Sequence, residues 1–304
     1  MRAANARRWL PILSLLGGAA GATLAVVTMR AQAPPAFDVK AHYEKRELMI
    51  PMRDGVELFT IVYTPRDRSQ QYPILLTRTA YGIPPYGPEH YRAVVGPNND
   101  FAREGYIVVY QDVRGKFKSE GDFIHHSPIV AGSAKPNEST DAYDTIDWLI
   151  KNVPNNNGRV GQWGISWGGW QVAMGMIGAH PAVKASSPQA PPQDQFLGDD
   201  HHSGGAFQLM YAFAWMSQNA RARNAPTEQG VGGFDYGTPD GYRFFLDLGA
   251  AANARQFFAN EVPTWNDYMT HGTYDDYWQS RNVPKDLTGI THPVLIVGAW
   301  FDAQ

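Results

Sequence analysis

The sequence contains no cysteine and carries little net charge. Without a thiol there is no disulfide, no cysteine nucleophile and no cysteine-ligated zinc site, so covalent catalysis would have to use another side chain. A formal net charge of -3 lacks the basic excess that is typical of a nucleic-acid-binding protein, so we expect no nucleic-acid partner. The histidines do not follow the H-E-x-x-H spacing of a zinc hydrolase, and we expect neither a metal nor another cofactor.

The first 33 residues contain the three parts of a secretory signal peptide. Basic residues precede an uncharged apolar stretch from Leu10 to Val27, and Ala31-Gln32-Ala33 resembles a cleavage site. We therefore interpret residues 1–33 as a signal peptide and expect a periplasmic or secreted protein. The apolar stretch is also long enough for an uncleaved anchor, and Pro34 would follow the cut, so both outcomes stay open.

Apolar runs separated by turn and helix signals predict an α/β fold. Two strand-like runs, residues 47–51 and 56–63, flank an Asp-Gly pair that is typical of a hairpin turn. The continuous apolar runs that follow are typical of strands buried on both faces. A helix is expected over Ser139 to Ile150, with Ser139 or Thr140 as its cap. Strands that alternate with helices predict a mostly parallel sheet.

The pattern changes in the second half of the chain. Residues 195–291 contain aromatic-rich helical segments without strand alternation, and we interpret them as a helical cap inserted between two strands of the sheet. The predicted organisation is therefore a core in two parts, residues 34–194 and 292–304, interrupted by the cap. The run PVLIVGAW, residues 293–300, is the last predicted strand.

The stretch Gly164-Ile165-Ser166-Trp167-Gly168 is a G-x-S-x-G motif. A short apolar run precedes it and a helical pattern follows it, which is the setting of a nucleophilic serine on a sharp strand-to-helix turn. Glycines two before and two after the serine let strand and helix pass closely. In such a turn the backbone N–H of Trp167 donates to an oxyanion. The alternative is a glycine-rich turn with a passive serine.

Six segments, in this order along the chain, carry a resemblance to a known family. The segments are MIPMRDGVEL (49–58), LTRTAYG (76–82), QDVRGK (111–116), GQWGISWGG (161–169), GDDHHSGGAF (198–207) and WFDAQ (300–304). They closely resemble the CocE/NonD-type serine hydrolases, which are the α-amino acid ester hydrolases, the cocaine-esterase-like hydrolases and the X-Pro dipeptidyl peptidases. The α-amino acid ester hydrolases and glutaryl-cephalosporin acylases are the most similar. The resemblance covers residues 44–304 and implies an α/β-hydrolase domain, a helical cap and a C-terminal jelly-roll domain.

The resemblance also implies site residues. Asp302 matches the family's catalytic aspartate, and Tyr81 matches the tyrosine whose hydroxyl completes the oxyanion hole. Asp200 matches the first member of a carboxylate cluster that holds the substrate ammonium, whereas Gln304 stands where those enzymes have another carboxylate. The family's histidine follows its aspartate, but all nine histidines precede Asp302. We therefore expect the catalytic histidine and the jelly roll to lie beyond Gln304.

These residues predict a serine hydrolase or acyltransferase that cleaves small esters or amides through an acyl-enzyme. The preferred substrates are α-amino acid esters or β-lactam acyl side chains. A cocaine-esterase-like or glutaryl-acylase specificity, for neutral or anionic acyl groups, is the alternative within the same class. A non-catalytic periplasmic binding protein is the alternative from another class. The oligomeric state stays open.

Overall fold

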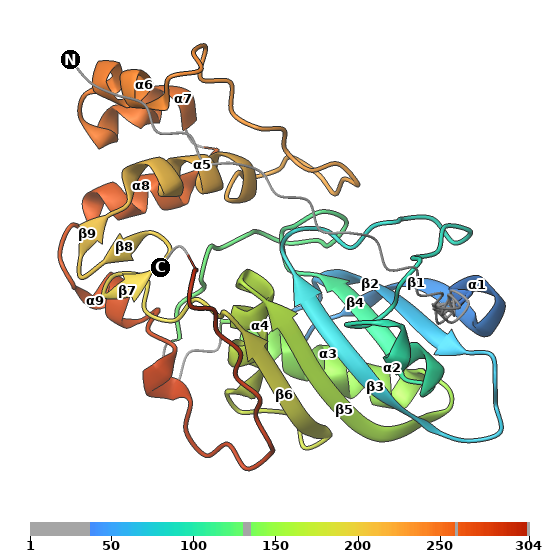
Figure 1. The fold of residues 1–304 in the computed structure, drawn as a ribbon. Helices are drawn as coiled ribbons and strands as arrows, with labels where there is room; N and C mark the ends of the chain where they lie inside the picture. Colours follow the sequence, from blue (N-terminus) through green and yellow to red (C-terminus); the bar gives the residue numbers. More distant parts are fainter. Residues whose placement is uncertain (1–36, 130–134, 259–260, 303–304) are drawn as a thin grey trace, which may run out of the picture. The chain divides into compact units, whose positions relative to one another are not determined.

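The computed structural model describes residues 37–129, 135–258 and 261–302, and Figure 1 shows their arrangement. The predicted signal peptide lies outside these residues. Within the described ranges, no helix has the length and apolar character needed to cross a membrane.

A six-stranded sheet forms the centre of the described chain. Its strand order is β1-β2-β4-β3-β5-β6. The first two strands form the predicted antiparallel hairpin, β2 also runs antiparallel to β4, and the last four strands in the order run parallel to one another. The sheet is therefore mostly parallel, as predicted. The strands are β1 (Tyr43–Pro51), β2 (Glu57–Pro65), β3 (Tyr72–Thr79), β4 (Ile107–Asp112), β5 (Asn156–Ile165) and β6 (Val183–Gln189).

The sheet is covered on both faces, which explains why its central strands are apolar without alternation. In β4, Ile107 and Val109 pack into a core with residues of α3 (Glu138–Asn152). Their neighbours Val108 and Tyr110 pack into a second core, to which α1 (Val39–His42) and α2 (Asn99–Arg103) contribute. Successive side chains of a strand point to opposite faces, so a strand buried on both sides is a continuous apolar run.

The helix α3 begins earlier than the sequence predicts. Its N-cap is Asn137, whose side chain accepts hydrogen bonds from the backbone N–H groups of Ser139 and Thr140. Thr140 in turn accepts from the backbone N–H of Asn137 through its hydroxyl, at 2.9 Å. The prediction of Ser139 or Thr140 as the cap was wrong because the two residues lie in the first turn and complete a capping box instead.

The segment after β6 folds around a separate aromatic core. Phe213, Trp265 and Trp278 are buried there, and Figure 1 shows the helices of this segment grouped away from the sheet. Residues 242–258, one of the aromatic-rich helical segments, do not form a continuous helix, because α6 (Gly241–Leu248) ends just before Gly249, which has a φ of 72°. A small three-stranded sheet, which the sequence analysis missed, precedes the helices. The elements are β7 (Gly198–Asp199), β8 (His202–Ser203), β9 (Ala206–Phe207), α5 (Leu209–Asn219), α6 (Gly241–Leu248), α7 (Arg255–Phe258), α8 (Pro263–Thr270) and α9 (Asp276–Gln279).

The last described segment returns to the main sheet next to β6. Val294 and Val297 form parallel bridges with Ser186 and Gln189. The backbone N–H of Leu295 donates to the carbonyl of Ser186 at 2.9 Å. The paired stretch covers fewer residues than the strand predicted over residues 293–300, but it has the predicted position and direction. Asp302 therefore follows a segment that runs parallel to β6, on the side of the sheet where the parallel strands have their carboxyl ends.

Candidate active site

Ser166 lies at the turn between β5 and α4 (Trp167–Met176). Its φ of 57° and ψ of -126° lie outside the regions that side-chain-bearing residues commonly adopt. The backbone on both sides holds this conformation, because Ser166 N–H donates to the carbonyl of Gln189 and its carbonyl accepts from Trp170 N–H. A strained, partly exposed serine at the start of a helix has the geometry of a nucleophile elbow.

The tight turn depends on two glycines. A Cβ at Gly164 would lie 2.3 Å from the carbonyl oxygen of Gly168, which real Cβ atoms do not tolerate. A Cβ at Gly169 would lie 2.4 Å from the carbonyl oxygen of Gln189 in β6. At Gly168 the nearest atom would be 3.5 Å away, which is ordinary contact. Gly168, the second glycine of the motif, is therefore less constrained sterically than Gly169, which lies outside the motif.

Tyr81 reaches Ser166 from the end of β3. The Tyr81 hydroxyl lies 3.4 Å from Ser166 Oγ, although the two residues are 85 positions apart. The tyrosine ring packs edge-on against the Trp167 ring, and its backbone N–H donates to Thr79 Oγ1 at 3.1 Å. Together these contacts direct the hydroxyl towards the turn that also presents the Trp167 N–H. The Tyr81 hydroxyl thus lies beside Ser166 Oγ, and the backbone N–H of Trp167 acts on the same hydroxyl.

The Tyr81 hydroxyl is protonated at neutral pH. Burial raises its pKa above the usual value of 10.0, and hydrogen bonds with Ser166 and Trp215 act in the opposite direction. The negative charge of Asp200 raises it further. A neutral phenol can donate a hydrogen bond to an oxyanion, whereas a phenolate cannot. The charge effect also shows that Asp200 lies in the neighbourhood of the serine.

Asp200 and Asp302, the two carboxylates that the sequence singles out, both influence the ionisation of Tyr211, as Tyr81 does. Asp200 is 9 % exposed and follows β7. The pKa of Tyr211 in α5 is raised to about 12, first by burial and then by the charges of Asp200 and Asp302, among others. Asp302 lines a cavity of about 420 Å³ together with Ala173 of α4 and Pro188 of β6. The fold therefore gathers carboxylates from two distant segments around the carboxyl ends of the strands.

A cluster of buried histidines surrounds Trp167. The rings of His125 and His126 lie 5.0 and 5.5 Å from the Trp167 ring, and His201 lies 5.6 Å from His125. Burial lowers the pKa of each, so the three imidazoles are neutral. Across the described part of the chain, no histidine is hydrogen-bonded to Ser166, and no group of three potential ligands could hold a metal ion. The cluster packs the aromatic wall behind the turn.

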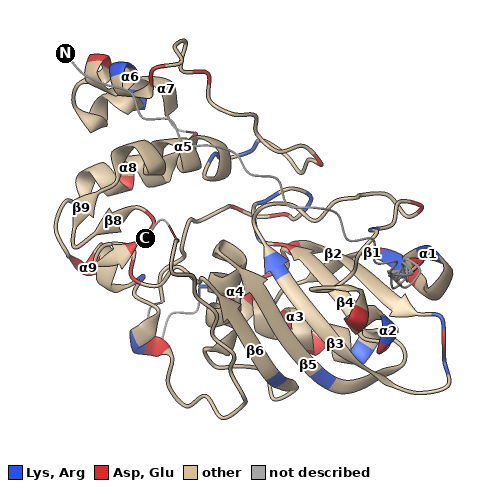
Figure 2. Cartoon of the chain, in the orientation of Figure 1, with Lys and Arg blue, Asp and Glu red and all other residues tan. Residues whose placement is uncertain are grey.

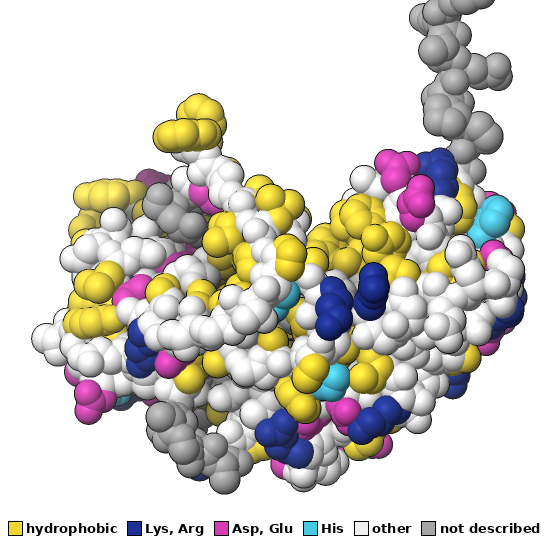
Figure 3. Space-filling model, turned by 90° about the horizontal axis from the view of Figure 1, so that it is seen from below, with side chains coloured by type: hydrophobic (Ala, Val, Ile, Leu, Met, Phe, Trp, Pro, Cys, Tyr) yellow, Lys and Arg dark blue, Asp and Glu magenta, His cyan; other side chains and the backbone are white. Residues whose placement is uncertain are grey.

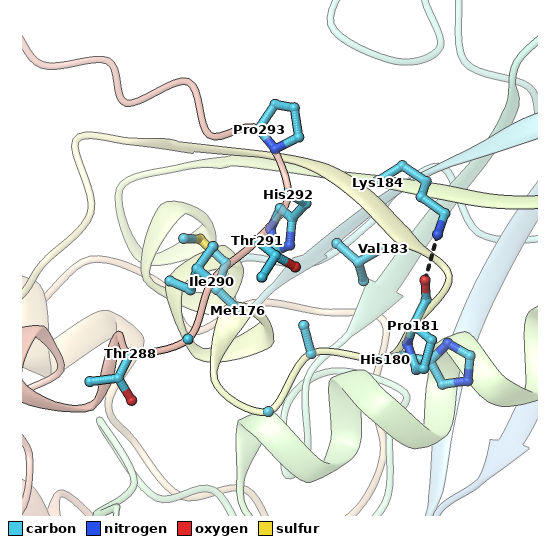
Figure 4. A pocket seen from close by; sticks show the side chains of 13 residues that line it. Met176, His180, Pro181, Val183, Lys184, Thr288, Ile290, Thr291, His292 and Pro293 are labelled. Carbon is cyan, nitrogen blue, oxygen red and sulfur yellow. Dashed lines mark hydrogen bonds between the residues drawn. The ribbon is translucent and has the colours of Figure 1, made fainter.

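A larger cavity of about 590 Å³ lies elsewhere (Figure 4). It is lined by His180 and Lys184 near the start of β6 and by residues 288–293, and His292 Nε2 lies 2.9 Å from Ser186 Oγ. The cavity lies near the amino end of β6, whereas Ser166 follows the carboxyl end of the parallel strand β5. Ligands of such sheets bind at the carboxyl ends of the strands, so size alone does not make this cavity the active site.

Comparison with known proteins agrees with the geometry. Residues 54–304 match the model of the X-Pro dipeptidyl-peptidase (S15) family. The chain belongs to this family. The match and the solved structures described next confirm the predicted α/β-hydrolase fold.

Three relatives define how far the similarity extends. The chain is 28 % identical to a cocaine esterase from Rhodococcus sp. (strain MB1 Bresler), over 84 % of this chain and 43 % of the relative. It is 36 % identical to an aminopeptidase from the marine sediment archaeon Thaumarchaeota archaeon, with a TM-score of 0.76 over 90 % of this chain and 46 % of the other. An α-amino acid ester hydrolase is 34 % identical, with a TM-score of 0.73 over 90 % and 45 %. The chain thus spans less than half of the length of each relative.

Proposed function

We propose that the protein is a serine hydrolase or acyltransferase that cleaves small esters or amides through an acyl-enzyme at Ser166. The observation that carries the proposal is the 3.4 Å approach of the Tyr81 hydroxyl to Ser166 Oγ, on a turn that also presents the Trp167 N–H. Attack of Ser166 Oγ on a carbonyl carbon moves an electron pair onto the carbonyl oxygen. The two donors then stabilise that oxyanion until the alcohol or amine leaves.

The serine also needs a base, because a neutral hydroxyl is a weak nucleophile. In the proposed mechanism a histidine accepts the Ser166 proton and returns it to the leaving group, while Asp302 orients the ring and stabilises its cation. Water, or an amine in acyl transfer, then attacks the acyl-enzyme. The proposal also includes export of the protein to the periplasm or beyond, which is supported by the sequence of residues 1–33 alone.

A fluorophosphonate probe tests the nucleophile directly. The protein expressed from its complete reading frame should be labelled at Ser166, and Ser166→Ala should abolish the labelling. Ser203→Ala, which removes an exposed hydroxyl elsewhere in the chain, is the matched control and should leave it unchanged. If the wild-type protein is folded but not labelled, the binding-protein alternative is the better explanation.

For the substrate we propose an acyl group with a free α-amino group. Asp200 is mostly buried near Tyr81, and a partly shielded carboxylate attracts an ammonium more strongly than a surface carboxylate does. Two of the relatives, an aminopeptidase and an α-amino acid ester hydrolase, also have names that refer to amino-bearing substrates. The similarity to a cocaine esterase favours the alternative, a neutral or anionic acyl group.

A comparison of two esters distinguishes these specificities. Wild-type protein should hydrolyse phenylglycine methyl ester with a higher kcat/KM than methyl phenylacetate, at a pH where the amine is protonated. Asp200→Asn should lower kcat/KM for the amino ester alone. An equal loss for both esters would make Asp200 a structural residue, and a wild-type preference for methyl phenylacetate would favour the alternative specificity.

A further inference from the structure

A second cavity, of about 250 Å³, shares Tyr81 with the active site. Its walls come from the loop after β4 and from the segment that begins at the end of α5, and Figure 2 marks basic residues on both. Three cations line it, and none of the described lining residues is an aspartate or glutamate. The cations are Lys116, Arg221 and Arg223, and the polar side chains of Gln218, Asn219, Thr227 and Gln229 line it as well.

Backbone carbonyls hold two of these cations in place. Lys116 Nζ donates to the carbonyl of Asn219 at 2.6 Å, and Arg223 Nε donates to the carbonyl of Gly115 at 3.0 Å. Arg223 makes another such bond to the carbonyl of Ser119. These bonds tie the loop after β4 to the segment after α5 across more than a hundred positions. They fix the cations without neutralising them, because a carbonyl carries no net charge.

Among the described residues, neither Lys116 nor Arg223 forms an ion pair, although the charge of Asp112 acts on both from farther away and that of Asp122 acts on Arg223. In the described part of the chain, neither residue lies within 4.0 Å of an acidic oxygen, whereas Arg221 is paired with Glu261. Lys116 is only 7 % exposed, and its pKa is lowered to about 8 by burial and by the charge of Arg223. Two like charges held close together are destabilising when one of them is buried, as Lys116 is here, and a bound anion would relieve this.

Basic side chains elsewhere on the molecule lie among acidic ones, as Figure 3 shows for the face that it presents. The nearby Lys118 has acidic partners, with Glu228 at 2.9 Å and Glu47 at 4.0 Å. Lys116 and Arg223 thus differ from the nearby Lys118, because neither has a carboxylate oxygen within 4.0 Å in the described part of the chain.

We propose that this cavity is a carboxylate-binding subsite, in which Lys116 and Arg223 hold a carboxylate of the substrate while Ser166 attacks its scissile carbonyl. The proposal rests on the proposed function and adds a substrate class to it, namely esters or amides that carry a carboxylate away from the reacting carbon. Arg221 adds positive charge at the wall, and the amide side chains supply further donors. The carboxylate belongs either to the acyl group or to the leaving group, and two pairs of esters tell these sources apart.

The first pair is mono-4-nitrophenyl glutarate and 4-nitrophenyl valerate, which differ in the charge of the acyl group. The second pair is 4-carboxyphenyl butyrate and 4-carbamoylphenyl butyrate, which differ in the charge of the leaving group. Wild-type protein from the complete reading frame should show a kcat/KM about tenfold or more higher for the charged ester of one pair, since a hydrogen-bonded ion pair contributes on this scale. Lys116→Gln should remove that preference by slowing the charged ester alone.

Lys118→Gln is the matched control. It removes the same charge as Lys116→Gln, but from a lysine that lies two positions further along the chain and already has acidic partners. It should leave the preference intact. No preference in either pair, or an equal effect of the two variants, would overturn the proposal.

Calorimetric titration with glutarate separates this proposal from the proposed function, because it needs no turnover. Glutarate should bind wild-type protein and the Lys118→Gln variant, and about tenfold or more weakly to the Lys116→Gln variant. If Lys116→Gln does not fold, increasing salt should still weaken glutarate binding to the wild type, because a charged contact is screened. Glutarate that does not bind the wild type would refute the subsite, whereas failure of the fluorophosphonate to label Ser166 would refute the function alone.

Discussion

Replacing Tyr81 by phenylalanine tests the oxyanion hole with the removal of a single oxygen atom. The hydroxyl is 3.4 Å from Ser166 Oγ, and the ring that carries it packs edge-on against Trp167. Phenylalanine keeps the ring and therefore keeps that packing. The partners of the Tyr81 hydroxyl, Ser166 and Trp215, are only partly buried, so we expect a change of less than about 0.5 kcal/mol in the free energy of unfolding.

The effect on catalysis should be much larger than the effect on stability. Removal of one oxyanion donor costs about a hundredfold to a thousandfold in kcat, or about 2.7–4 kcal/mol of transition-state stabilisation. The Trp167 N–H remains as the second donor, so activity should fall to this level without vanishing. Because the negative charge on the carbonyl oxygen develops only in the transition state, the loss should appear in kcat while KM changes little.

The assay is steady-state hydrolysis of a 4-nitrophenyl ester by wild-type protein and the Tyr81→Phe variant, both expressed from the complete reading frame. Thermal unfolding of both proteins checks that the fold is retained. Tyr242→Phe serves as the control, because Tyr242 is 72 % exposed in α6 and no described contact joins it to Ser166. An unchanged kcat in Tyr81→Phe, or an equal loss in both variants, would show that the hydroxyl has no part in catalysis.

Two further predictions concern stability. Gly164→Ala should destabilise the protein by more than about 4 kcal/mol, because the added Cβ would meet the Gly168 carbonyl oxygen at 2.3 Å; Gly272→Ala, which has open space, is the control in the same thermal unfolding experiment. Burial raises the pKa of Asp112 to about 7, so between pH ~4 and ~7 the folded protein keeps a proton that the unfolded chain loses, and the stability of the wild type falls as the pH rises. Asp112→Asn cannot ionise, so its melting temperature relative to wild type should rise by several degrees from pH 4.5 to pH 8; a difference independent of pH would contradict this.

Much of the core fold could be predicted from the sequence because its signals are local. The hairpin of β1 and β2, the buried strands β3 and β4 and the parallel character of the sheet follow from short apolar runs and turn residues. The cap was less predictable. Its small β7-β8-β9 sheet consists of two-residue strands, which are too short to leave a periodic pattern. The break at Gly249 lies inside an aromatic-rich segment with a helical pattern, where the conformation of the glycine outweighs the periodicity.

The candidate site divides in the same way. The sequence by itself determined the nucleophile turn, because strand, serine and helix are consecutive and their steric requirements fall on neighbouring residues such as Gly164. Only the tertiary structure decided what surrounds that serine. It brings the Tyr81 hydroxyl to Ser166 across 85 positions, and it joins Arg223 to Gly115 across 108 positions beside the same tyrosine. Such contacts depend on the register of the strands and on the path of the loops between them. Over so many positions of sequence, neither leaves a pattern in the spacing of residues.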